Sequence, residues 1–169
     1  HLIRTTELEF ELKDDETIVS SRISFYKNPK VSKTPNEFFL NGESLELLSI
    51  KINSTKANYE LKDDGLLLIE PPDSFILETT VRIHPERKTN LNGLYQSSGN
   101  FCTQCEAHGF RQITYYLDRP DILSIFTTHI NANKEKYPIL LSNGNLVEES
   151  SSHAIWHDPA PKQIGRASR

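Results

Sequence analysis

The sequence predicts a mainly β fold: an antiparallel β-sandwich or curved sheet that carries one long irregular segment and short helical turns. Short stretches of alternating apolar and polar residues recur along the 169 residues, and a period of two is that of a strand with one buried face. Turn signals such as Asn-Gly and Asp-Gly separate these stretches at the spacing of short strands. No strong helical periodicity accompanies them.

The N-terminal part predicts a pair of strands. In Glu7–Leu12 the apolar residues alternate strictly with glutamates, which indicates one buried and one solvated face. Val19–Phe25 alternates more weakly, and the polar residues Lys13-Asp14-Asp15 predict a turn between the two strands.

Two further hairpins are predicted next. Asn41-Gly42 stands between Phe38–Leu40 and Leu45–Ile52, and Asn-Gly is a strong hairpin signal. Lys62-Asp63-Asp64-Gly65 separates two further apolar stretches in the same way.

The rest of the chain predicts more strands. Leu77–Ile83 and Phe126–Ala132 alternate, and Asn143-Gly144 predicts a hairpin that joins Ile139–Leu141 to the residues after it. His153–His157 is consistent with a last strand.

The segment Leu91–Asp121 interrupts this pattern. It has little alternation over about 30 residues, and compact domains seldom carry so long an irregular segment unless it is functional. The alternative is a well-packed connection with buried tyrosines. Short helical turns are predicted at Ala107–Gln112 and Arg119–Ser124.

Composition excludes several classes of protein. The chain is 36% hydrophobic and 25% charged, as expected of a globular domain. Its net charge is −4 and it has no basic run, so no nucleic-acid partner is expected. No apolar stretch approaches the roughly 18 residues of a membrane span, so no membrane partner is expected either. Two cysteines fit a reducing compartment, which predicts a cytoplasmic protein.

Two patterns resemble metal or redox motifs. Cys102 and Cys105 have CxxC spacing, but no second ligand pair accompanies them, so two partly buried thiols are the preferred interpretation. His153 and His157 have the spacing of a zinc helix, but they lie in a predicted strand, where residues four apart are about 13 Å from each other. The chain also has no Gly-x-Ser-x-Gly and no phosphate loop. The sequence therefore predicts neither a metal site nor a catalytic residue within this chain.

Three segments together identify a resemblance: GLYQSSGNFCTQCEAHGFRQITYYLDRPDILSIFTT, KYPILLSNGN and DPAPK. They resemble the N-terminal domain of the bacterial alanyl aminopeptidases (aminopeptidase N), zinc metallopeptidases of the gluzincin type. The resemblance implies a saddle-shaped β domain over residues 1–162. It also implies a parent enzyme that removes N-terminal amino acids from peptides, with zinc bound by ligands outside this chain, in a separate catalytic domain.

The resemblance stops before residues 163–169, which are interpreted as a tail foreign to the family. The last strand or strands of the family domain are therefore expected to be missing, and an unpaired sheet edge can template association. The chain alone, without the catalytic domain, is expected to be inactive.

The resemblance also implies roles for two residues. Glu106 would be a carboxylate that anchors the substrate's α-ammonium, and Gln104 would line the pocket for the first side chain. If the segment is extended, both side chains point to the same side. The alternative is that Glu106 only pairs with Arg111 and that Gln104 caps a turn.

Other residues are interpreted as structural. Arg111, Asp118, Arg119 and Asp121 are expected to form charge-assisted hydrogen bonds that hold the segment around the two adjacent tyrosines.

A second function remains open: a stand-alone β-sandwich module that binds carbohydrate or protein. Such a module would need exposed aromatic residues on a sheet face, and the chain has a single tryptophan, Trp156.

Overall fold

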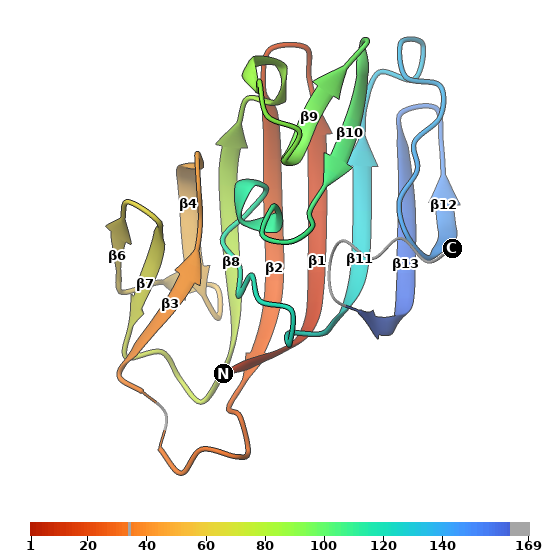
Figure 1. The fold of residues 1–169 in the computed structure, drawn as a ribbon. Coiled ribbons are helices and arrows are strands. Elements are labelled where there is room, and N and C mark those ends of the chain that lie inside the picture. Colours follow the sequence, from red (N-terminus) through yellow and green to blue (C-terminus); the bar gives the residue numbers. More distant parts are fainter. Residues whose placement is uncertain (34, 163–169) are drawn as a thin grey trace.

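The computed structural model describes residues 1–33 and 35–162, and it has the predicted mainly β architecture (Figure 1). The strands are β1 Leu2–Leu12, β2 Thr17–Tyr26, β3 Glu37–Asn41, β4 Glu46–Ile52, β5 Thr55–Lys56, β6 Tyr59–Lys62, β7 Gly65–Ile69, β8 Ser74–Ile83, β9 Gly93–Ser97, β10 Asn100–Gln104, β11 Ser124–Asn131, β12 Asn145–Glu149 and β13 His153–Lys162. The tail predicted at residues 163–169 lies outside the described residues.

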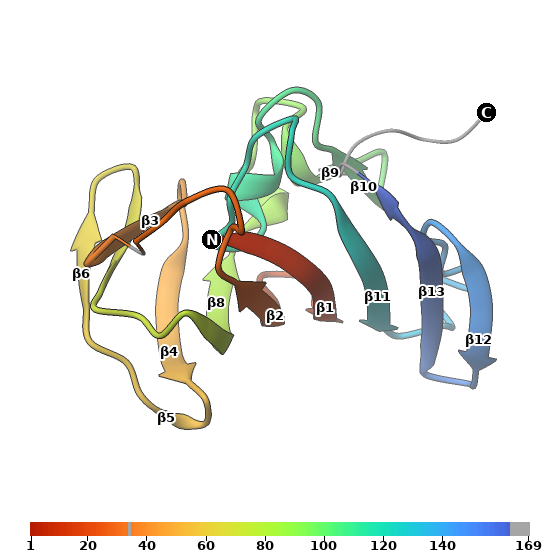
Figure 2. The same cartoon turned by 90° about the horizontal axis from the view of Figure 1, so that it is seen from below.

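Most strands belong to one curved sheet (Figure 2). Its eight strands have the order β12-β13-β11-β1-β2-β8-β4-β5, and a separate three-stranded sheet has the order β3-β7-β6. The described strands are mainly antiparallel, as predicted, and the exception is the pair β1 and β11, which are parallel. Two parallel strands need a long connection between them. Here all the elements from β2 to β10 lie between β1 and β11 in the chain.

The central strands follow the predicted alternation. In β1 the side chains of Leu8 and Phe10 are buried while the glutamates between them are exposed. In β2 and β8 every second residue is buried, and Val19, Ile23 and Leu77 are completely inaccessible to solvent. The predicted strands at these places, and those near β4, β11 and β13, are confirmed.

Two of the predicted hairpins are wrong. β3 pairs with β7 instead of β4. At the expected hairpin turn, the backbone of Asn41 exchanges two hydrogen bonds with Tyr116, at 2.8 and 3.0 Å, and is therefore not free to pair with β4. A Cβ atom at Gly42 would overlap the ring of Tyr115, so this glycine makes room for a ring. Ile139–Leu141 is not a strand, and β12 pairs with β13 after Gly144. The hairpin at Lys62–Gly65 is confirmed between β6 and β7.

Helical structure is limited to two short 3₁₀ turns, η1 Pro85–Arg87 and η2 Phe110–Gln112, across residues 1–33 and 35–162. The second lies inside the predicted turn at Ala107–Gln112. Near Arg119–Ser124 there is one turn, in which the N–H of Ile122 donates to the carbonyl of Arg119 at 3.2 Å. Among the residues that the structure describes, no helix has the length and apolar character needed to cross a membrane.

The predicted irregular segment is partly regular, since it contains the hairpin β9–β10. The part after the hairpin is fixed to the large sheet by buried hydroxyl groups. Thr114 donates a hydrogen bond to Ser21 at 3.0 Å, and the hydroxyls of Ser21 and Thr79 are 2.7 Å apart. All three residues are almost completely buried. Because buried polar groups need partners, this cluster specifies where the segment lies on the sheet.

Candidate functional site

The hairpin β9–β10 leads the chain to the candidate site. It lies over the face of the large sheet formed by β1 and β11 (Figures 1 and 2). Ser97 pairs with Asn100, which leaves a two-residue loop, and both loop residues have positive φ angles, 50° at Ser98 and 80° at Gly99. This is the turn geometry that matches the twist of paired strands, so the sequence Ser-Gly positions β10 locally.

After Gln104 the chain leaves the strand and turns. The N–H of Gly109 donates to the carbonyl of Cys105 at 2.9 Å, and η2 follows immediately. A Cβ atom at Gly109 would lie 2.5 Å from the carbonyl oxygen of Gln104 and would also overlap the side chain of Asn92. The segment is therefore not extended through Glu106, so the condition under which the side chains of Gln104 and Glu106 would point to the same side is not met.

Glu106 is exposed in the first part of this turn, which we call the Glu106 loop (residues 105–109). Within residues 1–33 and 35–162 no hydrogen bond or ion pair involves its carboxylate. The alternative in which Glu106 pairs with Arg111 is wrong, because Arg111 binds Asp118 instead. Gln104 is exposed at the end of β10, and its side chain has no hydrogen-bond partner in the same part of the chain.

The residues that follow the loop are firmly held. Arg111 Nε donates to Asp118 Oδ2 at 2.9 Å, and the backbone N–H of Arg111 donates to the same oxygen at 3.2 Å. Arg119 and Asp121 form a second pair at the surface, at 2.9 Å. The rings of Phe110 and Tyr116 meet edge to face with centroids 4.5 Å apart, and both side chains are buried. The predicted structural role fits the pair Arg111–Asp118, which is largely buried, whereas Arg119 and Asp121 form an exposed pair with each other.

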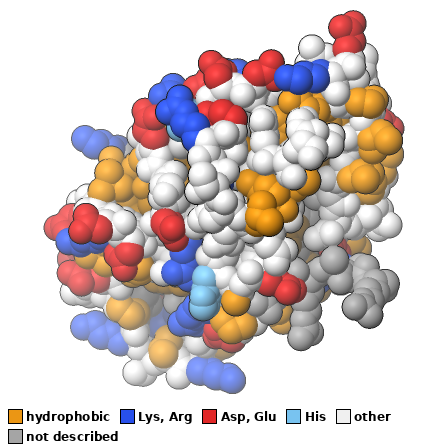
Figure 3. All heavy atoms as spheres, turned by 45° about the horizontal axis from the view of Figure 1, so that its top comes forward, with side chains coloured by type: hydrophobic (Ala, Val, Ile, Leu, Met, Phe, Trp, Pro, Cys, Tyr) orange, Lys and Arg blue, Asp and Glu red, His pale blue; other side chains and the backbone are white. Residues whose placement is uncertain are grey.

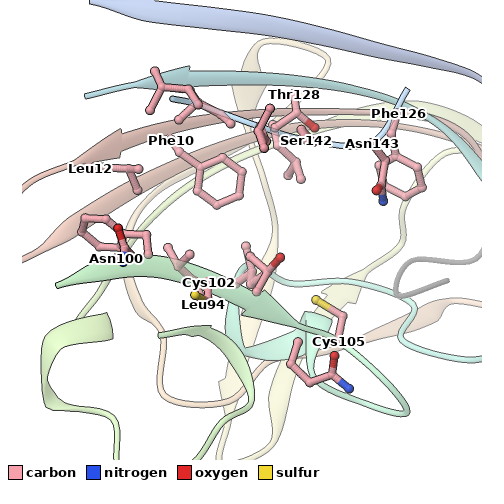
Figure 4. Close-up of a pocket in the computed structure, with 18 of the residues that line it drawn as sticks. Phe10, Leu12, Leu94, Asn100, Cys102, Cys105, Phe126, Thr128, Ser142 and Asn143 are labelled. Atoms are coloured by element: carbon pink, nitrogen blue, oxygen red, sulfur yellow. The ribbon is translucent and has the colours of Figure 1, made fainter. Parts of the chain in front are cut away.

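A cavity of about 630 Å³ lies between the hairpin and the large sheet. Figure 4 shows Phe10 and Phe126 of the sheet on one side of it and Cys102 and Cys105 of the hairpin segment on the other. The chain from Tyr137 to Asn143 completes the wall. Gln104, at the end of β10, lines this cavity, and Glu106, on the loop that follows, does not.

The two cysteines are free and half-buried, as predicted. Burial, with a smaller contribution from the negative charge of Asp118, raises the pKa of the Cys105 thiol to about 12. Because the thiolate is the nucleophile, Cys105 is poorly suited to redox chemistry near neutral pH.

We expect Cys105 to resist alkylation in the folded chain. At pH 8 a thiol with a pKa of about 12 is ionised in on the order of one molecule in ten thousand, against about one in four for an unfolded thiol. Iodoacetamide labelling at pH 8, followed by mass spectrometry, should therefore modify Cys105 at least a hundredfold more slowly in buffer than in concentrated urea. Equal rates in the two solvents would contradict this description of the thiol.

Nowhere in residues 1–33 and 35–162 does a group of three or more His, Cys, Asp or Glu side chains come together so as to hold a metal ion. Trp156 is half-buried and donates its indole N–H to the carbonyl of Leu140 at 3.1 Å. It is therefore engaged within the fold, and it does not supply the exposed aromatic surface expected of a carbohydrate-binding module. On the face in Figure 3, hydrophobic side chains form separate patches among charges of both signs.

One set of contacts near the site has no local signal in the sequence. Lys88 Nζ donates to Gln112 Oε1 at 3.0 Å, and Gln112 Nε2 donates to Glu43 Oε1 at 3.0 Å. The three residues are 24 and 69 positions apart, so neither spacing nor periodicity could have indicated this contact.

Comparisons with known proteins agree with this architecture. The family described as the peptidase M1 N-terminal domain matches residues 3–158. Aminopeptidase N of Escherichia coli (strain K12) is 45% identical over 166 residues, which cover 95% of this chain and 19% of that protein. The crystal structure of Legionella pneumophila aminopeptidase A in complex with aspartic acid has a TM-score of 0.88 and 33% identity over 95% of this chain and 20% of that one.

A third comparison shows the fold alone. The M1 zinc metallopeptidase E323A mutant from Deinococcus radiodurans, bound to a Tyr-Ser-Ala substrate, has a TM-score of 0.78 at 12% identity, over 95% of this chain and 39% of that chain. The present chain thus spans about a fifth of the length of the curated relative named above. With a family match over nearly the whole chain and this level of identity, the chain belongs to the peptidase M1 N-terminal domain family.

Proposed function

We propose that this chain is the substrate-gating N-terminal domain of a zinc aminopeptidase, an enzyme that removes N-terminal amino acids from peptides. The observation that carries the proposal is the position of Glu106: an exposed carboxylate without a partner in the described chain, on a loop followed by buried, hydrogen-bonded residues. A carboxylate held in this way is available to a cation supplied from outside the domain.

The proposed cation is the α-ammonium of a peptide substrate. An aminopeptidase must distinguish a free N-terminus from an internal peptide bond. A carboxylate enclosed by a second domain does so because it pairs with an ammonium group, and because it is left unpaired at a considerable cost when the ligand has none. Glu106 has this role in the proposal, and the closing surface is supplied by a catalytic domain outside this chain.

Gln104 has a separate proposed role. It is the last residue of β10 and is exposed, and the loop that carries Glu106 begins at the next residue. A neutral amide contacts side chains of varied chemistry without imposing a charge. We therefore assign Gln104 to the pocket of the first substrate side chain, where it suits broad specificity.

Zinc and the catalytic residues belong to the proposed partner domain. The described part of this chain offers no cluster of three metal-binding side chains, so no residue here is assigned to the metal. When bound in the parent enzyme, zinc would supply a Lewis acid for peptide hydrolysis. The proposed location of that enzyme is the cytoplasm, where free cysteines are ordinary.

The first test is activity. The isolated chain of 169 residues should bind no stoichiometric zinc and should not hydrolyse aminoacyl amides, whereas the full-length polypeptide that carries this domain should cleave substrates with a free α-amine and reject their N-acetylated forms. Zinc content is measured by atomic absorption, and turnover is measured with and without a chelator. One tightly bound zinc in the isolated chain, or chelator-sensitive turnover by it, would overturn the proposal.

A further inference from the structure

Lys88 lies directly after η1 and is only half exposed. Its ammonium group donates to the backbone carbonyl of Asn92 and to the side-chain oxygen of Gln112, each at 3.0 Å. Gln112 in turn donates to Glu43 at 3.0 Å. We call this set of three side chains, Lys88, Gln112 and Glu43, the Lys88 relay.

The Lys88 relay borders the C-terminal end of the Glu106 loop, at Gly109. Gln112 ends η2, which directly follows the Glu106 loop, and its backbone N–H donates to the carbonyl of Gly109 at 3.1 Å. Asn92, whose carbonyl binds Lys88, lies so close to Gly109 that a Cβ atom there would overlap its side chain. Gly109, the last residue of the loop, therefore lies between two segments that the same ammonium group connects.

The packing around Lys88 leaves room for its ammonium group and little more. A Cβ atom at Gly93 would lie 2.9 Å from Lys88 Nζ and 2.8 Å from the Cβ of Gln112. Gly93 also has a φ angle of 69°, a conformation that side chains disfavour. Glycine at the first position of β9 thus serves two purposes: it tolerates the positive φ angle, and it leaves space for the ammonium group of Lys88.

The charge of Lys88 is only partly compensated. Burial lowers the pKa of Lys88, while the negative charge of Glu43 acts in the opposite direction. The ammonium group of Lys88 is half-buried, its two acceptors are neutral, and the carboxylate of Glu43 is reached only through Gln112. A buried ionic group is by itself weak evidence of stability, so the geometry of these hydrogen bonds carries the role proposed for Lys88.

We propose that Lys88 is a positioning residue for Glu106, which it orients through Gln112 and Asn92 without touching the substrate. The inference rests on the proposed function of Glu106. Lys88 restricts the Glu106 loop before the substrate binds, so that the carboxylate is already placed where the ammonium group arrives. Such preorganisation raises the rate because a small misplacement of a binding group lowers catalytic efficiency strongly.

Enzyme kinetics on the full-length polypeptide provide the test. Lys88→Met keeps the length of the side chain and removes the donor, and Gln112→Met removes the centre of the relay. Each should lower kcat/KM by roughly three- to thirtyfold on every aminoacyl substrate. Lys62→Met removes an exposed lysine whose partner is Glu60 and serves as the control.

A double-mutant cycle separates positioning from general stability. In the Glu106→Ala background, Lys88→Met should lower kcat/KM by less than about twofold, because there is no carboxylate left to orient. If the two losses are instead independent and multiply, Lys88 acts on stability alone and the inference is wrong. If Glu106→Ala itself has no effect, the proposed function fails, whatever Lys88 does.

Hydrogen exchange gives a readout that does not depend on activity. In the 169-residue chain, Lys88→Met should accelerate exchange at the amides of Gly109 and Gln112, which donate to Cys105 and Gly109 at 2.9 and 3.1 Å. In Lys88→Met the amides of β2 and β8 should keep their wild-type exchange rates. In the control Lys62→Met the amides of Gly109 and Gln112 should keep theirs as well. Unchanged exchange at Gly109 and Gln112 would overturn the inference even if the proposed role of Glu106 holds.

Discussion

Replacing Glu106 with alanine in the full-length enzyme is expected to lower kcat/KM by roughly tenfold to several thousandfold. Removing one partner of a desolvated charge pair typically costs about 2–5 kcal/mol, much of it because the other charge stays buried without a partner, and about 1.4 kcal/mol corresponds to each factor of ten. In the described chain the Glu106 carboxylate has no internal partner, so its free energy of interaction is available to the substrate.

The loss should appear in kcat as well as in KM. The α-ammonium is one bond from the carbon that carries the scissile carbonyl, so a mispositioned amine also misplaces the reacting group. Glu106→Gln should show much of the same loss, because an amide can accept a hydrogen bond but does not carry the negative charge. Steady-state kinetics on several aminoacyl substrates measures both parameters.

Gln104→Ala is the matched comparison, since it removes an exposed polar side chain two residues earlier. It should change the preference among first side chains, with a smaller overall loss than Glu106→Ala. Folding, followed by circular dichroism, and zinc content should remain those of wild type in both variants. Wild-type efficiency of Glu106→Ala on all substrates would show that the carboxylate does not anchor the amine.

Asp118→Ala is expected to destabilise the domain by about 2–4 kcal/mol. The Asp118 side chain is 9% exposed, and one of its oxygens accepts hydrogen bonds from the side chain and the backbone of Arg111. Breaking a buried pair by removing one partner typically costs about 3–5 kcal/mol. The expected value is somewhat lower because the Arg111 side chain is 24% exposed and can gain some water.

The nearby pair Arg119–Asp121 provides a control with the same chemistry. Its side chains are 56% and 64% exposed, and exposed ion pairs contribute roughly 0–1 kcal/mol. Asp121→Ala should therefore leave the urea midpoint nearly unchanged, while Asp118→Ala lowers it clearly, with unfolding followed by the fluorescence of Trp156. Similar midpoints for the two variants would mean that burial does not distinguish the two pairs as described.

The strands of the central sheet follow from the sequence because their determinants are local. Burial of one face favours apolar residues at every second position, and β1, β2 and β8 have them at most of their buried positions, with Thr6, Ser21 and Thr79 as buried polar exceptions. The hairpin β6–β7 follows as well, from four polar and glycine residues between two apolar stretches. The family resemblance also comes from the chain alone, because the segment around Gln104 and Glu106 is long and irregular enough to be specific.

What the sequence could not determine depends on groups that meet only in the folded chain. Asn41-Gly42 has the residues of a hairpin, but the backbone of Tyr116 takes the hydrogen bonds and the ring of Tyr115 takes the space. The parallel neighbours β1 and β11 are likewise separated by more than a hundred residues, and pairing over such distances leaves no periodic signal.

The same division holds for the candidate site. Sequence alone identified Glu106 and Gln104 by motif, but it left open whether the segment through both is extended. The fold ends β10 at Gln104 and places Glu106 on a turn. Only the tertiary structure assigned Arg111 to Asp118 and brought Lys88 to Gln112. The physical reason is that a charged side chain takes whichever partner the packing of the backbone brings within hydrogen-bonding distance, and that packing is decided by the whole chain.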